Sequence, residues 1–188
     1  MFPILKKALT PLLLLFLLTG NEATAQHPGD RFDPENPDMA YLVSLVDHKI
    51  NAYREKKRIP GLSLEEDLNS AAGLHADYLK KKGKLDHFQN KAAFKTPVER
   101  VAHYNPTYKS VGENIAYVAT ANIRIRDGEK EILHKTYGEM SEELVSNWIQ
   151  SKPHHKNIVD KGYTRTGISM AHDPVKSRIY SVQVFAAK

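Results

Sequence analysis

The fold is decided by the stretch Asn147-Trp148-Ile149-Gln150-Ser151-Lys152-Pro153-His154-His155-Lys156-Asn157-Ile158-Val159. It holds the only tryptophan and the only pair of adjacent histidines in the 188 residues. An apolar helical pattern runs into Pro153, and a proline interrupts the hydrogen bonding of a helix interior. We therefore expect Trp148 to anchor a helix in the core, while His154 faces a different direction.

The helix that carries Trp148 is predicted to begin at a capping box formed by Thr136 and Glu139, each of which can bond the other's backbone N–H. Its apolar face consists of Met140, Leu144, Val145 and Trp148. A short helical piece then follows Ser151 and Pro153 and ends near Gly162. Two strands, at about 166–172 and 178–186, are predicted to close the chain.

The N-terminal half is predicted to contain two helices and a long loop. Asp38 suits the cap of the first helix, whose apolar residues recur at helical spacing. Ser63 and Glu66 fit a capping box for the second helix, and Gly83 suits its end. Residues 84–111 show no lasting periodicity, so we expect a long loop there, with one helical turn near Pro97.

A strand is predicted at 114–120, followed by a hairpin over 122–133. Asp127-Gly128 is typical of a type I′ turn between two paired strands. Isoleucines alternate with charged residues on both sides of that turn. This alternation predicts a hairpin with one exposed face.

The first 25 residues have the pattern of a secretory signal peptide. Lys6 and Lys7 precede an apolar run from Leu9 to Leu18, and small residues at 23–25 suit a cleavage site. The apolar run is shorter than the roughly 20 residues that a transmembrane helix needs. We therefore expect no transmembrane segment after cleavage. Residues 26–40, polar and rich in proline, predict a mobile leader, and 41–188 predict one domain.

Charge and cysteine content narrow the classes of function. The net charge is +5, or +4 after cleavage because two lysines and one glutamate leave (+5 − 2 + 1). This excess permits binding to anionic surfaces. Basic residues are not interleaved with aromatic ones, so we expect no nucleic-acid binding. The chain has no cysteine, which excludes disulfides and thiolate chemistry.

The candidates for chemistry are His87, Glu113, His154 and His155. Neutral imidazoles with a carboxylate can hold a divalent cation and leave a position open for water. The same groups can act as general acids and bases near neutral pH. A third interpretation is that these residues have only a structural role: a histidine caps a turn, and the glutamate bonds to backbone N–H groups. The sequence has no Gly-x-Ser-x-Gly elbow and no His-Glu-x-x-His motif.

Three motifs together resemble the CAP superfamily, which includes cysteine-rich secretory proteins, antigen 5 and pathogenesis-related 1 proteins. They are Gly112-Glu113-Asn114-Ile115-Ala116, Trp148-x-x-Ser151-x-x-His154-x-x-Asn157-Ile158, and Gly167-Ile168. The resemblance extends to Asn51-x-x-Arg54, His87 and Pro97-x-x-Arg100, and covers roughly 41–185. The cysteine-free form is similar to the bacterial branch of the family.

The resemblance implies an α+β fold, a three-layer α/β/α sandwich with a small antiparallel central sheet. It also implies a cavity lined by two histidines and acidic groups. His87 and Glu113 match the first histidine and the glutamate of the Gly-Glu-Asn motif, and His154 matches the second histidine. Ser151 stands where the family has another glutamate, so the acidic set is incomplete. Residues 119–135 form a longer segment than bacterial relatives usually carry.

From this resemblance we expect a secreted protein, periplasmic or extracellular. We also expect His87 and His154 to hold a divalent cation, for which zinc is the leading candidate. The leading functional hypothesis is a non-catalytic binding module for a lipid, a cell-wall component or a protein partner. The alternative is a metal- or histidine-dependent hydrolase of peptides or esters. Its candidate catalytic residues are His87, Glu113 and His154.

Overall fold

The computed structural model describes residues 26–188, so the predicted signal peptide of residues 1–25 lies outside the described residues. A four-stranded sheet forms the centre, in the order β1 (Ser63–Leu64), β5 (Arg165–Asp173), β6 (Arg178–Ala187) and β2 (Ser110–Ala119). The strands β5, β6 and β2 are antiparallel. The two-residue β1 pairs with β5 in parallel and makes the sheet mixed, which the sequence did not predict.

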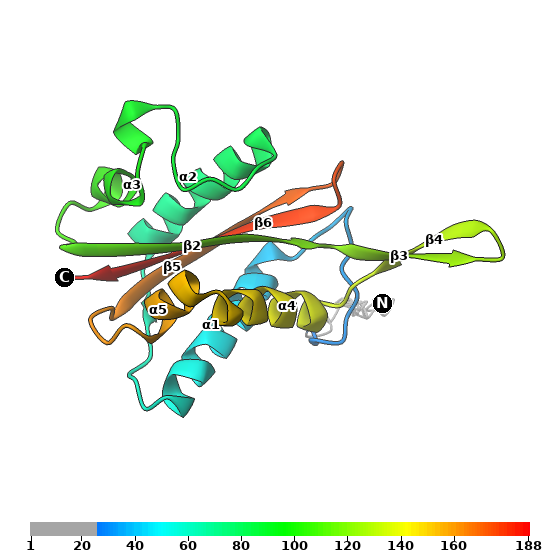
Figure 1. Cartoon of the computed structure of the whole chain (residues 1–188), viewed down its shortest axis with the longest axis horizontal. Helices are drawn as coiled ribbons and strands as arrows, with labels where there is room; N and C mark the ends of the chain where they lie inside the picture. Colours follow the sequence, from blue (N-terminus) through cyan, green and yellow to red (C-terminus); the bar gives the residue numbers. More distant parts are fainter. Residues whose placement is uncertain (1–25) are drawn as a thin grey trace, which may run out of the picture.

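Helices cover both faces of this sheet (Figure 1). On one face lie α1 (Met39–Lys56), α4 (Tyr137–Gln150) and α5 (Lys152–Val159). On the other lie α2 (Glu66–Lys82) and α3 (Pro97–Tyr104), with the short 3₁₀ helix η1 (Ala92–Phe94) between them in sequence. The α+β class and the three-layer arrangement are therefore confirmed. A separate hairpin of β3 (Ala121–Arg126) and β4 (Glu129–His134) extends away from the body.

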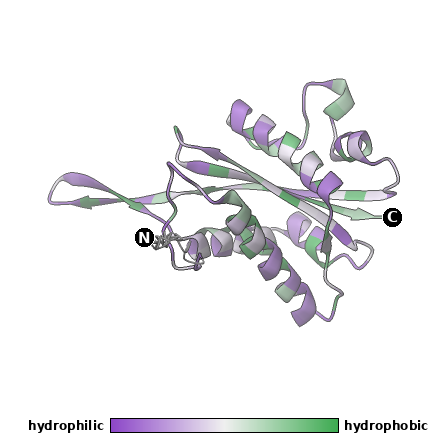
Figure 2. Ribbon diagram, turned by 180° about the vertical axis from the view of Figure 1, so that it is seen from behind, coloured by the Kyte–Doolittle hydropathy of each residue, from purple (hydrophilic) through white to green (hydrophobic). Residues whose placement is uncertain are grey.

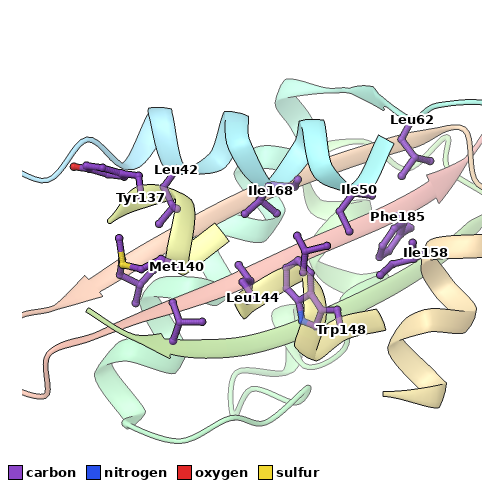
Figure 3. Packing of buried hydrophobic residues seen from close by; sticks show 14 of the residues in the cluster. Leu42, Ile50, Leu62, Tyr137, Met140, Leu144, Trp148, Ile158, Ile168 and Phe185 are labelled. Atoms are coloured by element: carbon purple, nitrogen blue, oxygen red, sulfur yellow. The ribbon is translucent and has the colours of Figure 1, made fainter. Parts of the chain in front are cut away.

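The larger core lies between the sheet and the layer of α1 and α4. Trp148 is fully buried there, as its place at the end of the apolar pattern predicted. Figure 3 shows its indole among Ile50 of α1, Leu144 of α4, Ile158 of α5 and Phe185 of the sheet. The predicted capping box of Thr136 and Glu139 is present at the start of α4. This helix is thus fixed at its first turn and anchored near its end.

The second core lies between the sheet and α2, where alanines allow close packing. Ala71, Ala72 and Ala76 are buried against β5 and β6. Gly167 of β5 marks the closest approach, since a Cβ there would lie 2.1 Å from the carbonyl carbon of Leu68. No side chain fits at that distance. The glycine is therefore required for α2 to pack on the sheet.

Two helix starts differ from the sequence predictions. The capping box of Ser63 and Glu66 is wrong, because Ser63 belongs to β1 and α2 begins without a side-chain cap. The backbone N–H of Ser63 instead donates to the carbonyl of Thr164, so sheet pairing takes precedence over capping. The turn expected near Pro97 is a full helix, opened by a capping box of Thr96 and Glu99.

Residues 26–38, which the sequence predicts to be a mobile leader, pack against the body. Phe32 is 2% exposed and its ring contacts those of Tyr137 and His172. The backbone N–H of Phe32 donates to the carbonyl of Lys135 at 2.9 Å. Composition alone did not reveal this contact, because one apolar residue in a polar stretch has no periodic pattern. Met39 and Ala40, also placed in the leader, already belong to α1.

Figure 2 shows hydrophilic and hydrophobic residues interspersed along the helices, and the hairpin of β3 and β4 largely hydrophilic with short hydrophobic stretches. Within residues 26–188, every helix is too short or too polar to cross a lipid bilayer.

Candidate functional site

The two predicted metal ligands come from different layers of the fold and meet beside β2. His87 lies in the loop after α2, whereas His154 lies in the first half of α5. Their ring centroids are 6.5 Å apart, with the rings tilted by 59°. Glu113, the third candidate, extends from β2. The structure thus brings His87, Glu113 and His154 together, although 67 positions separate the two histidines in sequence (154 − 87).

Glu113 is a buried carboxylate with both oxygens occupied. Its side chain is 1% exposed; Oε1 accepts from Nδ1 of His87 at 2.8 Å, and Oε2 accepts from Nη2 of Arg100 at 2.6 Å. An ionised carboxylate can only accept hydrogen bonds. In the neutral form of His87, the bond to Glu113 places the ring proton on Nδ1 and leaves the lone pair on Nε2.

Arg100 orders the loop that carries His87. Its side chain is 1% exposed, and Nη1 donates to the carbonyls of Phe94 and Lys95 at 3.0 and 3.3 Å. Nη2 also donates to the carbonyl of His87 at 3.2 Å. One guanidinium therefore holds both Glu113 and the backbone of the loop. The sequence placed Arg100 in a family motif but did not reveal this role.

His75 lies beneath Glu113 and was not among the predicted site residues. It is fully buried, where the sequence had indicated the edge of the core. Nδ1 pairs with the side-chain nitrogen of Gln89 at 2.9 Å, and Nε2 lies 3.7 Å from Oε1 of Glu113. Burial lowers the pKa of His75 to about 4, although the nearby Glu113 acts in the opposite direction. His75 is therefore neutral at pH 7.

Two asparagines fix α5 against β2. Asn114 donates to the carbonyl of His154 at 3.1 Å. Asn157 donates to the carbonyl of Glu113 at 3.2 Å and to the side-chain oxygen of Asn114 at 2.9 Å. These bonds set the position of His154 relative to Glu113. Burial, followed by repulsion from His87, lowers the pKa of His154 below its ordinary value, so its imidazole is neutral at pH 7.

His155, the neighbour of His154, faces away from this site. Its Nε2 lies 3.0 Å from the hydroxyl of Tyr53 on α1. The adjacent histidines therefore have separate environments, and His155 takes no part in the site.

A cavity of about 440 Å³ adjoins His154, between α4 and β2. Cavities of about 300–1,000 Å³ with a largely apolar wall and a few polar groups are typical of small-molecule sites. Its apolar wall comes from Leu85, Ile115, Ala116, Tyr117 and Trp148, and its polar groups from Glu143, Asn147, Ser151 and His154.

His87 and His154 are the two side chains of the site that could donate to a cation. A catalytic zinc has about three protein ligands. Within residues 26–188, no three His, Cys, Asp or Glu side chains gather in a geometry that could hold a metal ion. The oxygens of Glu113 already accept from Arg100 and His87, so this carboxylate orients a ligand and does not add one. His87 and His154 are therefore the available donors. A zinc hydrolase has three protein ligands, so this site has one ligand fewer.

Residues 48–185 match the sequence profile of the cysteine-rich secretory protein family, CAP. The chain belongs to this family, which confirms the resemblance noted from its motifs. Unlike the cysteine-rich proteins after which the family is named, this chain contains no cysteine.

Among proteins of known sequence, the uncharacterized protein YkwD of Bacillus subtilis (strain 168) is 27% identical over 146 residues, which are 78% of this chain and 48% of that protein. The chain thus spans about half of that relative.

Solved structures share the fold at low identity. An outer surface protein of Borrelia burgdorferi has a TM-score of 0.62 at 16% identity, over 85% of this chain and 98% of that one. An extracellular protein with an SCP domain from Bacillus anthracis has a TM-score of 0.60 at 19% identity, over 80% and 41% of the two chains.

Proposed function

We propose that the chain is a secreted CAP-domain binding module, whose His87–His154 cleft holds a divalent cation, zinc first, beside a cavity for an extracellular ligand. Of the three ligand classes, a lipid is favoured over a cell-wall component or a protein partner, because the wall of the cavity is largely apolar. Secretion is supported by the signal-peptide pattern of residues 1–25 and by structural relatives described as extracellular or outer-surface proteins.

The observation that carries the proposal is the hydrogen bond from Nδ1 of His87 to Glu113. A buried carboxylate that binds one ring nitrogen of a histidine fixes its tautomer and orientation, and raises the basicity of the other nitrogen. That other nitrogen, Nε2, belongs to a ring 6.5 Å from His154 between centroids. Two imidazoles at this separation support a shared cation.

The hydrolase alternative has less support from the geometry. An activated nucleophile needs a base within hydrogen-bond reach, about 2.6–3.2 Å away. Within residues 26–188, no serine or threonine hydroxyl hydrogen-bonds to the imidazole of His87 or His154. The two-imidazole donor set is also incomplete for a zinc-bound nucleophile. Binding without turnover is therefore the better account of this site.

A combined binding and turnover assay tests the proposal. The purified protein and its His154→Ala variant are incubated with lipid vesicles, cell-wall fragments, and model peptide and ester substrates. We expect the parent to retain a lipid or cell-wall ligand and the variant to lose it, without hydrolysis in either sample. Product formed by the parent and lost in His154→Ala would establish the hydrolase instead.

A further inference from the structure

The strand β2 lies at the edge of the central sheet. Within residues 26–188 it pairs only with β6, with α2 on one side and α4 on the other (Figure 1). Thr120, just after β2, donates to the carbonyl of Ser177, just before β6. Alternate residues of an antiparallel strand bond to the same side, so the odd-numbered residues of β2 direct their N–H and C=O outward. The carbonyl of Glu113 accordingly accepts from Asn157 of α5.

Beyond Glu113, the outward-facing backbone groups of Ile115 and Tyr117 have no partner. In the part of the chain that the structure describes, no group hydrogen-bonds to their N–H or C=O at this edge. Unpaired groups on an edge strand are a template to which another extended chain can add. The open part of the edge is short, because Asn157 covers the position of Glu113.

The cavity between α4 and β2 crosses this open edge. Side chains of a strand alternate between the two faces of a sheet. Ile115 packs in the core on the α2 side, and the ring of Tyr117 lies 5.9 Å from that of Tyr180 in the same core. Ala116 packs against the core on the α4 side. All three consecutive residues nevertheless line the cavity, so it reaches both faces of β2 and the backbone edge between them.

The cavity therefore offers a ligand two kinds of contact. Its apolar wall suits an acyl chain, whereas each outward-facing residue of β2 offers one N–H and one C=O. A plain fatty chain would leave these backbone groups without a partner, and buried polar groups left unpaired cost free energy. A ligand with both an acyl chain and an amide satisfies the wall and the edge together.

We propose that the ligand of this cavity is an N-acylated peptide, whose amide pairs with the backbone of Tyr117 at the edge of β2. This inference rests on the proposed function, because it names the class of lipid that the cavity holds. The acyl chain lies along the apolar wall. The N–H of Tyr117 donates to a carbonyl of the ligand, and the C=O of Tyr117 accepts from the acylated nitrogen.

Matched synthetic probes test the proposal. They are dodecanoyl-alanine amide, its ester analogue with oxygen in place of the acylated nitrogen, dodecanoic acid, and acetyl-alanine amide. Trp148, the only tryptophan, lines the cavity, so its fluorescence reports occupancy. We expect the acylated amide to bind most tightly. The ester should bind about tenfold more weakly, because it cannot donate to the C=O of Tyr117.

A variant of β2 tests the other hydrogen bond. Tyr117→Pro removes the outward N–H, and proline is tolerated on an edge strand where the N–H faces away from the sheet. Tyr117→Ala is the matched control, since it also removes the ring but keeps the N–H. The acylated amide should bind about tenfold more weakly to Tyr117→Pro than to Tyr117→Ala, whereas dodecanoic acid should bind both equally. Melting temperatures verify folding; if Tyr117→Pro does not fold, the amide and ester probes on the parent protein decide.

The outcomes separate this proposal from the proposed function. If the parent binds the ester or dodecanoic acid as tightly as the acylated amide, this proposal is overturned, but lipid binding stands. Equal affinity for acetyl-alanine amide and dodecanoyl-alanine amide would identify a peptide ligand and also overturn it. If no probe with the long chain binds, the lipid ligand of the proposed function fails, and this inference fails with it.

Discussion

At the scale of single residues, Glu113 controls the orientation of the site. One oxygen accepts from the guanidinium of Arg100, which orders the loop, and the other accepts from the imidazole of His87. A buried charge is costly unless it is paired and hydrogen-bonded, and both conditions are met here. The same carboxylate that stabilises the loop therefore also directs the lone pair of His87.

His75 gives a prediction about pH and stability. Its pKa is about 4 in the folded chain and about 6.5 when exposed, so the unfolded chain binds more protons between these values. Its contribution is fully present above pH 6.5 and is lost as pH falls to about 4. The difference corresponds to about 3 kcal/mol of unfolding free energy, since each pKa unit is worth about 1.4 kcal/mol.

Denaturant titrations from pH 7 to pH 4 measure this loss. We expect the unfolding free energy of His75→Asn to depend less steeply on pH than that of the parent. His154 and His172, whose pKa values burial also lowers, leave a residual slope in both proteins. Equal slopes would show that His75 is not held neutral by burial.

At the scale of elements, Arg54 joins the end of α1 to the segment after α5. It is 1% exposed and donates to four carbonyls at 2.8–3.0 Å: those of Pro60, Ile158, Asp160 and Tyr163. Arg54→Met keeps the length of the side chain but leaves these acceptors without a donor. We expect it to reduce the unfolding free energy by about 3 kcal/mol or more, because unsatisfied buried polar groups cost about 1–3 kcal/mol each. Chemical denaturation measures the change.

The matched control is Arg58→Met, since Arg58 is exposed. Surface substitutions of this kind are usually within about 0.5 kcal/mol of neutral. A loss in Arg54→Met as small as that in Arg58→Met would contradict the anchoring role of Arg54.

Trp148 and His154 lie on consecutive helices and should differ in what they contribute. Trp148 is fully buried in the larger core, whereas His154 is partly exposed at the cleft. Truncation of a buried tryptophan costs about 3–5 kcal/mol, so Trp148→Ala should destabilise the protein more than His154→Ala. Denaturation midpoints of both variants provide the comparison. Equal midpoints, or the reverse order, would count against Trp148 as the anchor of α4.

At the scale of the whole molecule, local patterns predicted the elements whose signals lie within a few residues. The capping box at Thr136 and the turn at Asp127-Gly128 are two examples, and both are present. Family motifs pointed to His87, Glu113 and His154, which the fold brings close together.

The residues that surround and orient Glu113 could not be predicted in the same way. His75 and Arg100 lie against Glu113, and Gln89 bonds to His75, so these contacts join residues at least 13 positions apart in sequence, which no local pattern reveals. The capping box at Thr96 and Glu99 was present in the sequence, but the surrounding prolines and lack of periodicity concealed it. Phe32 likewise gave no periodic signal because it is a single apolar contact in a polar segment.

The central claim is that His87 and His154 together hold one cation. Zinc titration by calorimetry tests it most directly, with the parent, His155→Ala and the double variant His87→Ala/His154→Ala at pH 7.5 and 5.5. The first two should bind one zinc per chain at pH 7.5, because His155 faces Tyr53 and not the cleft. Both should bind more weakly at pH 5.5, since protons compete for imidazoles with an ordinary pKa of about 6.5. The double variant should lose this binding; zinc affinity equal to that of the parent would contradict the claim.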